Sequence, residues 1–301
     1  MTRFFVAGLI NIETTLAIEG FPLAYSPDNY PYFGVQSTIS GVGLNIAKAL
    51  TTLGNRVDFA SLIGEDDNGW LVRKRLCEEG IPDDLVLSRL METAQSVIIY
   101  EKDGRRQIHT DLKDIQQQSY PLEQGESALR ACDLAVICNI NFSRPLLALA
   151  KALGKPIATD VHAQSSLEDD YNRDYFQAAD ILFMSDERLL GSPESVARDV
   201  MNRFLAKILV IGLGKKGALL AVRSDDFIGR FDAVRTREVV NSIGAGDALF
   251  SAFLDRYMRT GDPYASLRAA MVFASYKIGE KGAADGFLTS DELDTWVRKS
   301  K

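Results

Sequence analysis

The sequence of 301 residues has few of the side chains that build disulfide frameworks or zinc sites. It contains three cysteines and two histidines, and no Cys-x-x-Cys pair. An odd cysteine count does not suit a disulfide framework, and His109 and His162 are too far apart to form a His-x-x-x-His ligand pair. A disulfide-stabilised fold and a structural zinc site are therefore not expected.

Long apolar runs and an excess of positive charge are also absent. No run reaches the roughly 18 apolar residues needed to span a bilayer, and the first residues lack the apolar segment and cleavage site of a signal peptide. We therefore expect a cytoplasmic protein with no membrane partner. The formal net charge of -7 does not suit a general nucleic-acid binder, although backbone N–H groups at a helix start can still bind an anion.

Hydrophobic residues make up 46% of the chain, which is ample for a sizeable core. The length allows two domains, but one large α/β domain fits equally well. Short apolar runs alternate with segments of helical periodicity, which predicts a mainly parallel sheet with helices on both faces. The expected strands are 3–9, 56–62, 134–139, 156–159, 181–184 and 207–212, and the expected helices are 43–53, 67–79, 144–153, 171–178, 193–204, 246–259 and 263–279.

Two regions interrupt this alternation. Residues 14–38 are rich in Pro, Tyr and Gly, and residues 95–110 hold two β-like runs around Lys102-Asp103-Gly104. Asp-Gly is a favoured hairpin turn. The two regions could form a small antiparallel lid beside the main sheet, and ordinary surface loops explain the pattern equally well.

A glycine-rich turn before the helix at 246–259 is the most informative segment. Gly244-Ala245-Gly246 follows an apolar run, and glycine lets backbone N–H groups approach a ligand closely. The helix start adds unpaired N–H donors and the positive end of the helix dipole, so the segment predicts a cradle for a phosphoryl group. Asp247, in the first turn, could accept the proton of an attacking hydroxyl, and a helix-capping role explains it equally well.

The segment 241–253, NSIGAGDALFSAF, resembles the D-T-x-G-A-G-D signature of the PfkB, or ribokinase-like, carbohydrate kinases. Residues 40–50, SGVGLNIAKAL, resemble the N-terminal G-G-x-G-x-N-x-A motif of that family. Residues 64–69 match its G-x-D-x-x-G, and residues 8–13 are similar to its opening G-x-x-N-x-D. The order and spacing of these motifs hold over essentially the whole chain.

The resemblance implies one kinase domain over residues 1–301, folded as a three-layer α/β/α sandwich with a mainly parallel sheet. It also implies a small β lid formed by residues of about 12–39 and 95–112. The implied activity is ATP-dependent phosphorylation of an alcohol group of a sugar or ribonucleoside. Asp247 would be the base, Gly244, Ala245 and Gly246 would form the anion hole, and the substrate would be held by Asn11, Glu13, Gly41, Gly43 and Asn45.

The nucleotide is expected near the strand at 207–212. Gly212-x-Gly214-x-x-Gly217 matches a dinucleotide fingerprint, but Gly217 leads into the apolar strand ALLAV and not into a helix. A Rossmann dehydrogenase is therefore not expected, and no Walker A loop is present. The resemblance implies ATP here, with the nucleotide-binding residues Gly212, Gly214, Gly217, Ser185, Glu187 and Gly282.

The sequence departs from the family pattern at three places. Ser40 replaces the first glycine of the N-terminal motif. Asn241 replaces an aspartate that helps to hold a monovalent cation, so potassium activation is in doubt. The Asn-x-x-Glu that organises Mg²⁺ through water is degenerate, with Glu187 or Asp186 as the candidate substitute. Mg²⁺ is still expected because it neutralises phosphate charge, although carboxylates at a helix start explain this acidic pair equally well.

Three further expectations remain open. His162, shortly after the strand at 156–159, could contact phosphate or substrate, and a surface-loop role is favoured. The resemblance and the apolar, aromatic residues of 21–39 and 95–101 predict a homodimer through the lid. The degenerate magnesium motif leaves open a different class of function, a non-catalytic ligand-binding or regulatory protein on the same fold.

Overall fold

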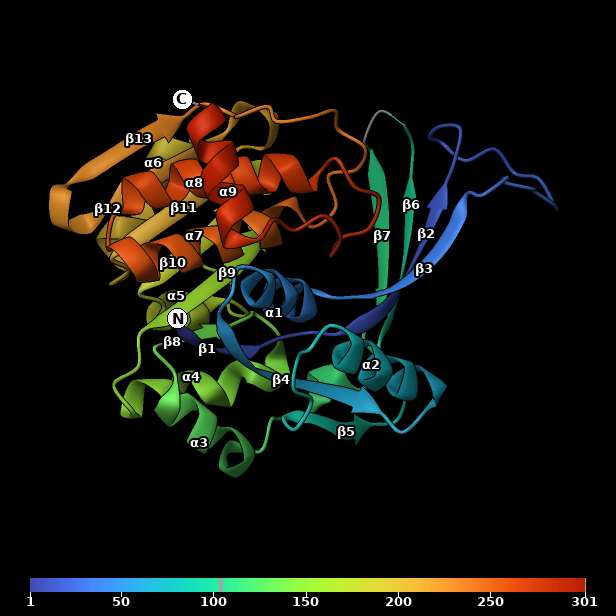
Figure 1. The fold of residues 1–301 in the computed structure, drawn as a ribbon, viewed down its shortest axis with the longest axis horizontal. Coiled ribbons are helices and arrows are strands. Elements are labelled where there is room, and N and C mark those ends of the chain that lie inside the picture. The colour runs from blue at the N-terminus through green and yellow to red at the C-terminus, as the bar shows by residue number, and fades with distance from the viewer. Residues whose placement is uncertain (103–104, 301) are drawn as a thin grey trace.

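The computed structural model describes residues 1–102 and 105–300, and these form two sheets. The larger sheet has nine strands in the order β13-β12-β11-β10-β9-β8-β1-β4-β5 (Figure 1). Its strands are β1 (Arg3–Ala7), β4 (Arg56–Gly64), β5 (Val86–Leu90), β8 (Leu134–Ile137), β9 (Ile157–Ala163), β10 (Ile181–Ser185), β11 (Ile208–Gly212), β12 (Ala218–Val222) and β13 (Phe227–Phe231).

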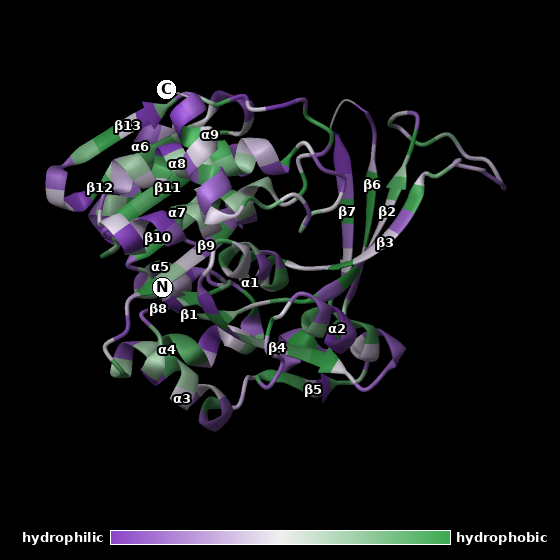
Figure 2. Cartoon of the chain, in the orientation of Figure 1, coloured by the Kyte–Doolittle hydropathy of each residue, from purple (hydrophilic) through white to green (hydrophobic). Residues whose placement is uncertain are grey.

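All neighbouring strands from β11 to β5 run parallel, and β12 and β13 are added antiparallel at one edge. The central strands are continuously apolar, as in residues 4–7 of β1, which are fully buried. A parallel sheet covered on both faces has this composition because neither face meets water. The green strands inside the body in Figure 2 show the same pattern.

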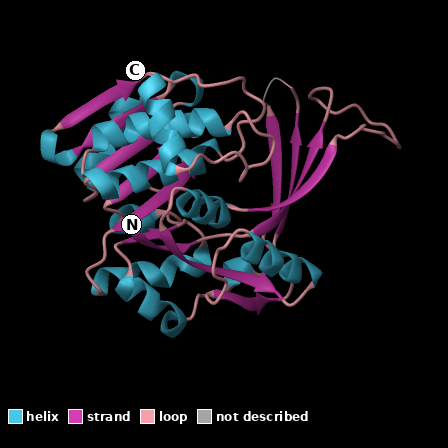
Figure 3. Ribbon diagram, in the orientation of Figure 1, coloured by secondary structure: helices cyan, strands magenta, loops and turns pink. Residues whose placement is uncertain are grey.

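Helices cover both faces of the large sheet and complete the predicted three-layer sandwich (Figure 3). The two hydrophobic clusters that line the faces of the sheet draw on different helices. One layer consists of α1 (Val42–Thr52), α2 (Asp67–Glu78), α7 (Ala245–Thr260), α8 (Pro263–Lys277) and α9 (Ser290–Lys299). The other consists of α3 (Leu122–Ala131), α4 (Arg144–Ala152), α5 (Arg173–Ala178) and α6 (Pro193–Arg203).

The two interrupting regions form the second sheet, which stands beside the body in Figure 1. Its order is β3-β2-β6-β7, with β2 (Asn11–Ala17), β3 (Val35–Ser40), β6 (Gln95–Tyr100) and β7 (Arg106–Asp111). We call this sheet the lid. The expected antiparallel arrangement is wrong for its central pair, because β2 and β6 run parallel and belong to separate chain segments and not to one hairpin. The predicted turn at Asp103-Gly104 lies outside the described residues.

The predicted strands and helices are all present, with ends that differ by a few residues. The sequence prediction missed β5, β13, α3 and α9. β13 is only partly buried and contains Gly229, so it lacks a strong apolar run. In the described part of the chain, no helix combines the length and the apolar character needed to cross a membrane.

Candidate active site

The start of α7 is open to a ligand. Gly244 precedes the helix with a φ of 75°, and a Cβ there would collide with the carbonyl oxygen of Ala283. Within the part of the chain that the structure describes, no side chain caps this helix start, and a Cβ added at Gly246 would meet nothing within 4 Å. The N–H of Ala245 donates to the Ser242 carbonyl oxygen at 3.2 Å, so the N–H groups of Gly244 and Gly246 are the ones available to bind an anion.

Asp247 lies beside this helix start and is buried, with 8% of its surface exposed. Its Oδ2 accepts a hydrogen bond of 2.7 Å from Nδ2 of Asn45 on α1. A helix-capping role does not describe it, because Gly244 holds the N-cap position and no side chain caps the helix. Burial raises the pKa of Asp247, while the hydrogen bond from Asn45 lowers it. A carboxylate with a raised pKa is a stronger proton acceptor than an ordinary aspartate.

The lid supplies two buried polar side chains on the substrate side. Asn11 donates from Nδ2 to Oγ of Ser96 at 2.9 Å, and its buried Oδ1 has no partner among the described residues. Burial raises the pKa of Glu13, and the nearby negative charge of Asp247 raises it further. A hydrogen bond with Ser40 acts in the opposite direction. An unpaired buried oxygen and a buried carboxyl group are both suited to accept hydroxyl donors of a polyol.

Gly41 and Gly43 are required by packing at the junction of β1 and α1. Gly41 has a φ of 111°, and a Cβ on it would lie 2.6 Å from the Leu9 carbonyl oxygen. A Cβ on Gly43 would collide with the backbone of Gly8. The close approach of these backbones explains both glycines and places Asn45 one turn further along α1, so their contact with substrate stays a prediction.

The expected nucleotide residues lie at the carboxyl ends of β10 and β11. Gly212 pairs in register with Ser185, and a turn containing Gly214 connects β11 to β12. Gly217 has a φ of 97°, and a Cβ on it would collide with the carbonyl oxygen of Phe231. Because Gly217 leads into a strand, the dinucleotide fingerprint is excluded.

The remaining expected nucleotide and metal residues have different surroundings. Oγ of Ser185 accepts a 3.3 Å hydrogen bond from the backbone N–H of Glu187, whose side chain is exposed. Gly282 lies in a small cleft with Thr38 of the lid and Lys48 of α1. Among the described residues, no three His, Cys, Asp or Glu side chains converge as a metal site. The carboxylates therefore fit Mg²⁺ only through water and substrate phosphates, since Mg²⁺ prefers oxygen ligands and keeps several waters.

Arg106 is a candidate that the sequence analysis missed. From β7 of the lid, Nη1 donates to Oγ of Ser242 at 2.9 Å, and Nη2 lies 3.4 Å from Oε1 of Glu187. It therefore joins the lid to both the glycine-rich turn and the end of β10. The exposed strand β7 gave no sequence signal for this role, because an arginine after a hairpin turn is ordinary surface composition.

Lys277 is the second residue that the sequence analysis missed. It lies on α8 with no exposed surface, and Nζ donates to the carbonyl oxygen of Ile243, directly before Gly244. In the sequence, Lys277 lies near the end of a long helix among small and apolar residues, where a lysine is not unusual, so the sequence alone did not single it out. Only its burial in the structure marks Lys277 as unusual, because a charged side chain is almost never fully buried without a partner.

His162 lies close enough to influence Asp247 but makes no hydrogen bond to it. Its Nδ1 is 3.7 Å from Oδ2 of Asp160, and its backbone N–H donates to Oδ1 of the same residue at 2.8 Å. The imidazole is 42% exposed. The backbone of His162 has a positive φ of 57°, and the role of this residue stays a prediction.

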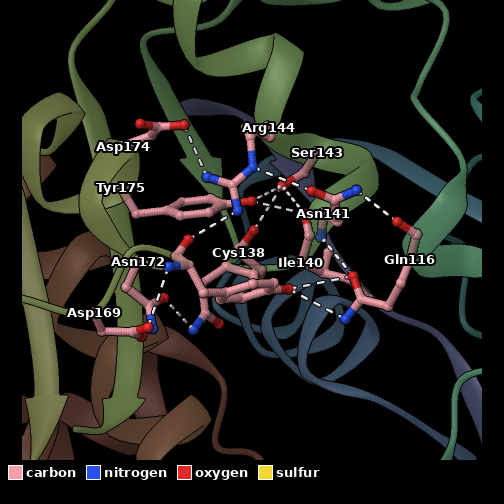
Figure 4. A network of polar contacts seen from close by, with 12 residues as sticks. Gln116, Cys138, Ile140, Asn141, Ser143, Arg144, Asp169, Asn172, Asp174 and Tyr175 are labelled. Carbon is pink, nitrogen blue, oxygen red and sulfur yellow. Dashed lines mark hydrogen bonds and ion pairs between the residues drawn. The ribbon is translucent and has the colours of Figure 1, made fainter.

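A separate polar network lies after β8 (Figure 4). Asn141 hydrogen-bonds with Gln116 through its backbone N–H and side-chain amide, and Oδ1 of Asn141 accepts from Arg144. The Tyr175 hydroxyl donates to the carbonyl oxygen of Ile140 at 2.7 Å, and Oγ of Ser143 lies 3.1 Å from the Tyr175 hydroxyl and 2.8 Å from the same carbonyl oxygen. These groups satisfy one another, so the network holds the loop after β8 in place.

Comparison with known proteins assigns the family. The model of the pfkB family carbohydrate kinases matches residues 1–290. The chain belongs to this family. The predicted class is therefore confirmed, and the chain is an enzyme of the carbohydrate-kinase type.

Two relatives match over almost the full length of the kinase. It is 26% identical to an acarbose 7(IV)-phosphotransferase of Actinoplanes sp., over 91% of each chain. It is also 26% identical to an ATP-dependent ribose-1-phosphate kinase of Halopiger xanaduensis, over 94% of each chain. A solved microbiome-derived acarbose kinase has a TM-score of 0.89 and 24% identity, over 99% of each chain. That likeness confirms the predicted ribokinase-like fold.

Proposed function

We propose that the kinase transfers the γ-phosphoryl group of ATP to an alcohol group of a sugar or ribonucleoside, with Asp247 as the general base. The observation that carries this proposal is the position of Asp247. It is buried beside an uncapped helix start and is held by Asn45. A proton acceptor next to an anion cradle is the pair of groups that phosphoryl transfer to an alcohol needs.

The described side chains suggest how the alcohol is held. Oδ1 of Asn11 and the carboxyl group of Glu13 accept substrate hydroxyl groups. The reacting hydroxyl then lies near Asp247, which takes its proton as the oxygen attacks the γ-phosphorus. The bond from the γ-phosphorus to the β,γ-bridging oxygen breaks, and ADP leaves. Most of the acceleration comes from this positioning and from fixed electrostatics.

The phosphates meet donors from two elements, the start of α7 and the lid, and a metal ion would add to them. The N–H groups of Gly244 and Gly246 stabilise the charge that develops on the transferred group. Arg106 brings a guanidinium to the same place from the lid. Glu187 would hold Mg²⁺ through water, and the ion would further neutralise phosphate charge when ATP is bound.

The names of the relatives favour a carbohydrate or a sugar phosphate as the acceptor. One is named for acarbose and another for ribose 1-phosphate. The competing function is that of a non-catalytic binding protein, and such a protein would not require the buried carboxylate of Asp247 as a base. We therefore expect turnover when ATP and Mg²⁺ are supplied with a panel of sugars, sugar phosphates and nucleosides. Ligand-induced thermal stabilisation without any phosphorylated product across the panel would support the binding protein.

We further propose that the lid forms a homodimer interface. Four aromatic side chains of the segment between β2 and β3 are 82–94% exposed: Tyr25, Tyr30, Tyr32 and Phe33. Such an apolar patch is costly to leave in water. Light scattering at micromolar concentration should give twice the chain mass, and replacing two of the tyrosines with Ser should give the monomer mass. A monomer mass for the native protein would contradict the proposal.

A further inference from the structure

The surroundings of Asn241 do not fit the monovalent cation that the family resemblance implies. Oδ1 of Asn241 accepts from the Ile243 N–H at 2.9 Å, and Nδ2 donates to the Lys281 carbonyl oxygen at 2.9 Å. The Ile243 carbonyl oxygen accepts from the ammonium of Lys277. A cation needs free oxygen ligands, whereas here an amide N–H and an ammonium group already point at the available carbonyls.

We propose that the ammonium group of Lys277 is a built-in cation that supports the anion hole in place of a bound monovalent ion. Its hydrogen bond to the Ile243 carbonyl fixes the peptide that enters Gly244, and its charge lies behind the helix start. Lys277 is thus a positioning residue, because it acts on the transferred phosphoryl group through the backbone of the cradle. This inference rests on the proposed phosphoryl transfer.

Burial and charge around Lys277 agree with this role. The side chain is fully buried, and burial lowers its pKa to about 8. The negative charges of four nearby carboxylates raise the pKa of Lys277: Asp247 on α7, Glu13 on β2, and Asp285 and Glu280 after α8. With this pKa, the ammonium form predominates at pH 7. Burying an unpaired charge costs free energy, so a lysine at this position indicates an electrostatic role in addition to packing.

The test compares cations and two substitutions. Turnover of the native kinase is measured in potassium, sodium and tetramethylammonium chloride at one ionic strength, and we expect values within about twofold of one another. Lys277→Met removes the charge without leaving a large void, and kcat should fall at least tenfold in every salt. Lys277→Ala leaves a cavity, so it should gain potassium or methylammonium activation of at least fivefold. Lys151→Met is the control, because exposed Lys151 also donates to a backbone carbonyl, that of Gln177.

A second measurement does not depend on turnover. Thermal unfolding of the native protein should be insensitive to exchange of tetramethylammonium for potassium, and Lys277→Ala should gain a potassium-specific rise in Tm. Potassium activation of the native kinase above threefold, a potassium-specific Tm shift of the native protein, or full activity of Lys277→Met would overturn the proposal. These native-protein outcomes decide the matter even if a variant fails to fold. Absence of product in every salt, with an insensitive native Tm, would count against the proposed function and not against the internal cation.

Discussion

Replacing Arg106 with Ala should slow the transfer step and leave the fold intact. The guanidinium reaches Ser242 and Glu187 from the lid and keeps 30% of its side chain exposed. A unit charge 4 Å from another contributes about 4 kcal/mol at an effective dielectric constant near 20. Partial exposure reduces this to about 2–3 kcal/mol of transition-state stabilisation. Since each 1.4 kcal/mol is tenfold, kcat should fall about 30- to 150-fold.

The neighbouring Arg105 provides a matched control. Its side chain is 68% exposed, lies 3.6 Å from Glu101, and stacks near the ring of Phe21. Arg105→Ala removes the same charge from the same strand region and should change kcat by less than twofold. Steady-state kinetics on both variants, with saturating alcohol substrate, measure the difference. If Arg106→Ala and Arg105→Ala kept equal kcat values, the assigned role of Arg106 would be refuted.

Three other expectations follow from the same site. Asp247→Asn should lower kcat by roughly 10²–10⁴-fold with ATP affinity nearly unchanged, and a variant that retains a tenth of native kcat would exclude the base. Gly246→Val should stop turnover at an unchanged Tm because its side chain enters the open cradle, so an active variant would place the phosphates elsewhere. The kcat–pH profile should fall on the acid side as Asp247 gains a proton, at a higher pH than for an ordinary aspartate, and on the alkaline side near pH 8 as Lys277 loses its proton. A profile with no fall on the alkaline side up to pH 9.5 would contradict the role of Lys277, and an acid limb that Asp247→Asn leaves unchanged would contradict the role of Asp247.

The sequence predicted the sandwich well because its strands are nearly all apolar and its helices are periodic. It also predicted the order of the site motifs, since the glycine-rich turn and the first turn of α7 are contiguous in the chain. It did not predict the parallel pairing of β2 with β6, because pairing between distant segments leaves no local pattern. Periodicity likewise could not identify Arg106 or Lys277, whose roles depend on where an exposed strand and a helix interior meet the cradle.

The pairing of Asn45 with Asp247 has a consequence for how the active site is made. The two residues are 202 positions apart, and Asn55, in the loop after α1, donates to Asp255 of α7 in a second hydrogen bond of 2.7 Å. Neither hydrogen bond can therefore form until α7 has been synthesised. A nascent chain that has produced only the lid and the first strands holds hydroxyl-binding groups but no proton acceptor. The growing polypeptide therefore becomes catalytically competent only late in synthesis, and incomplete chains cannot consume ATP.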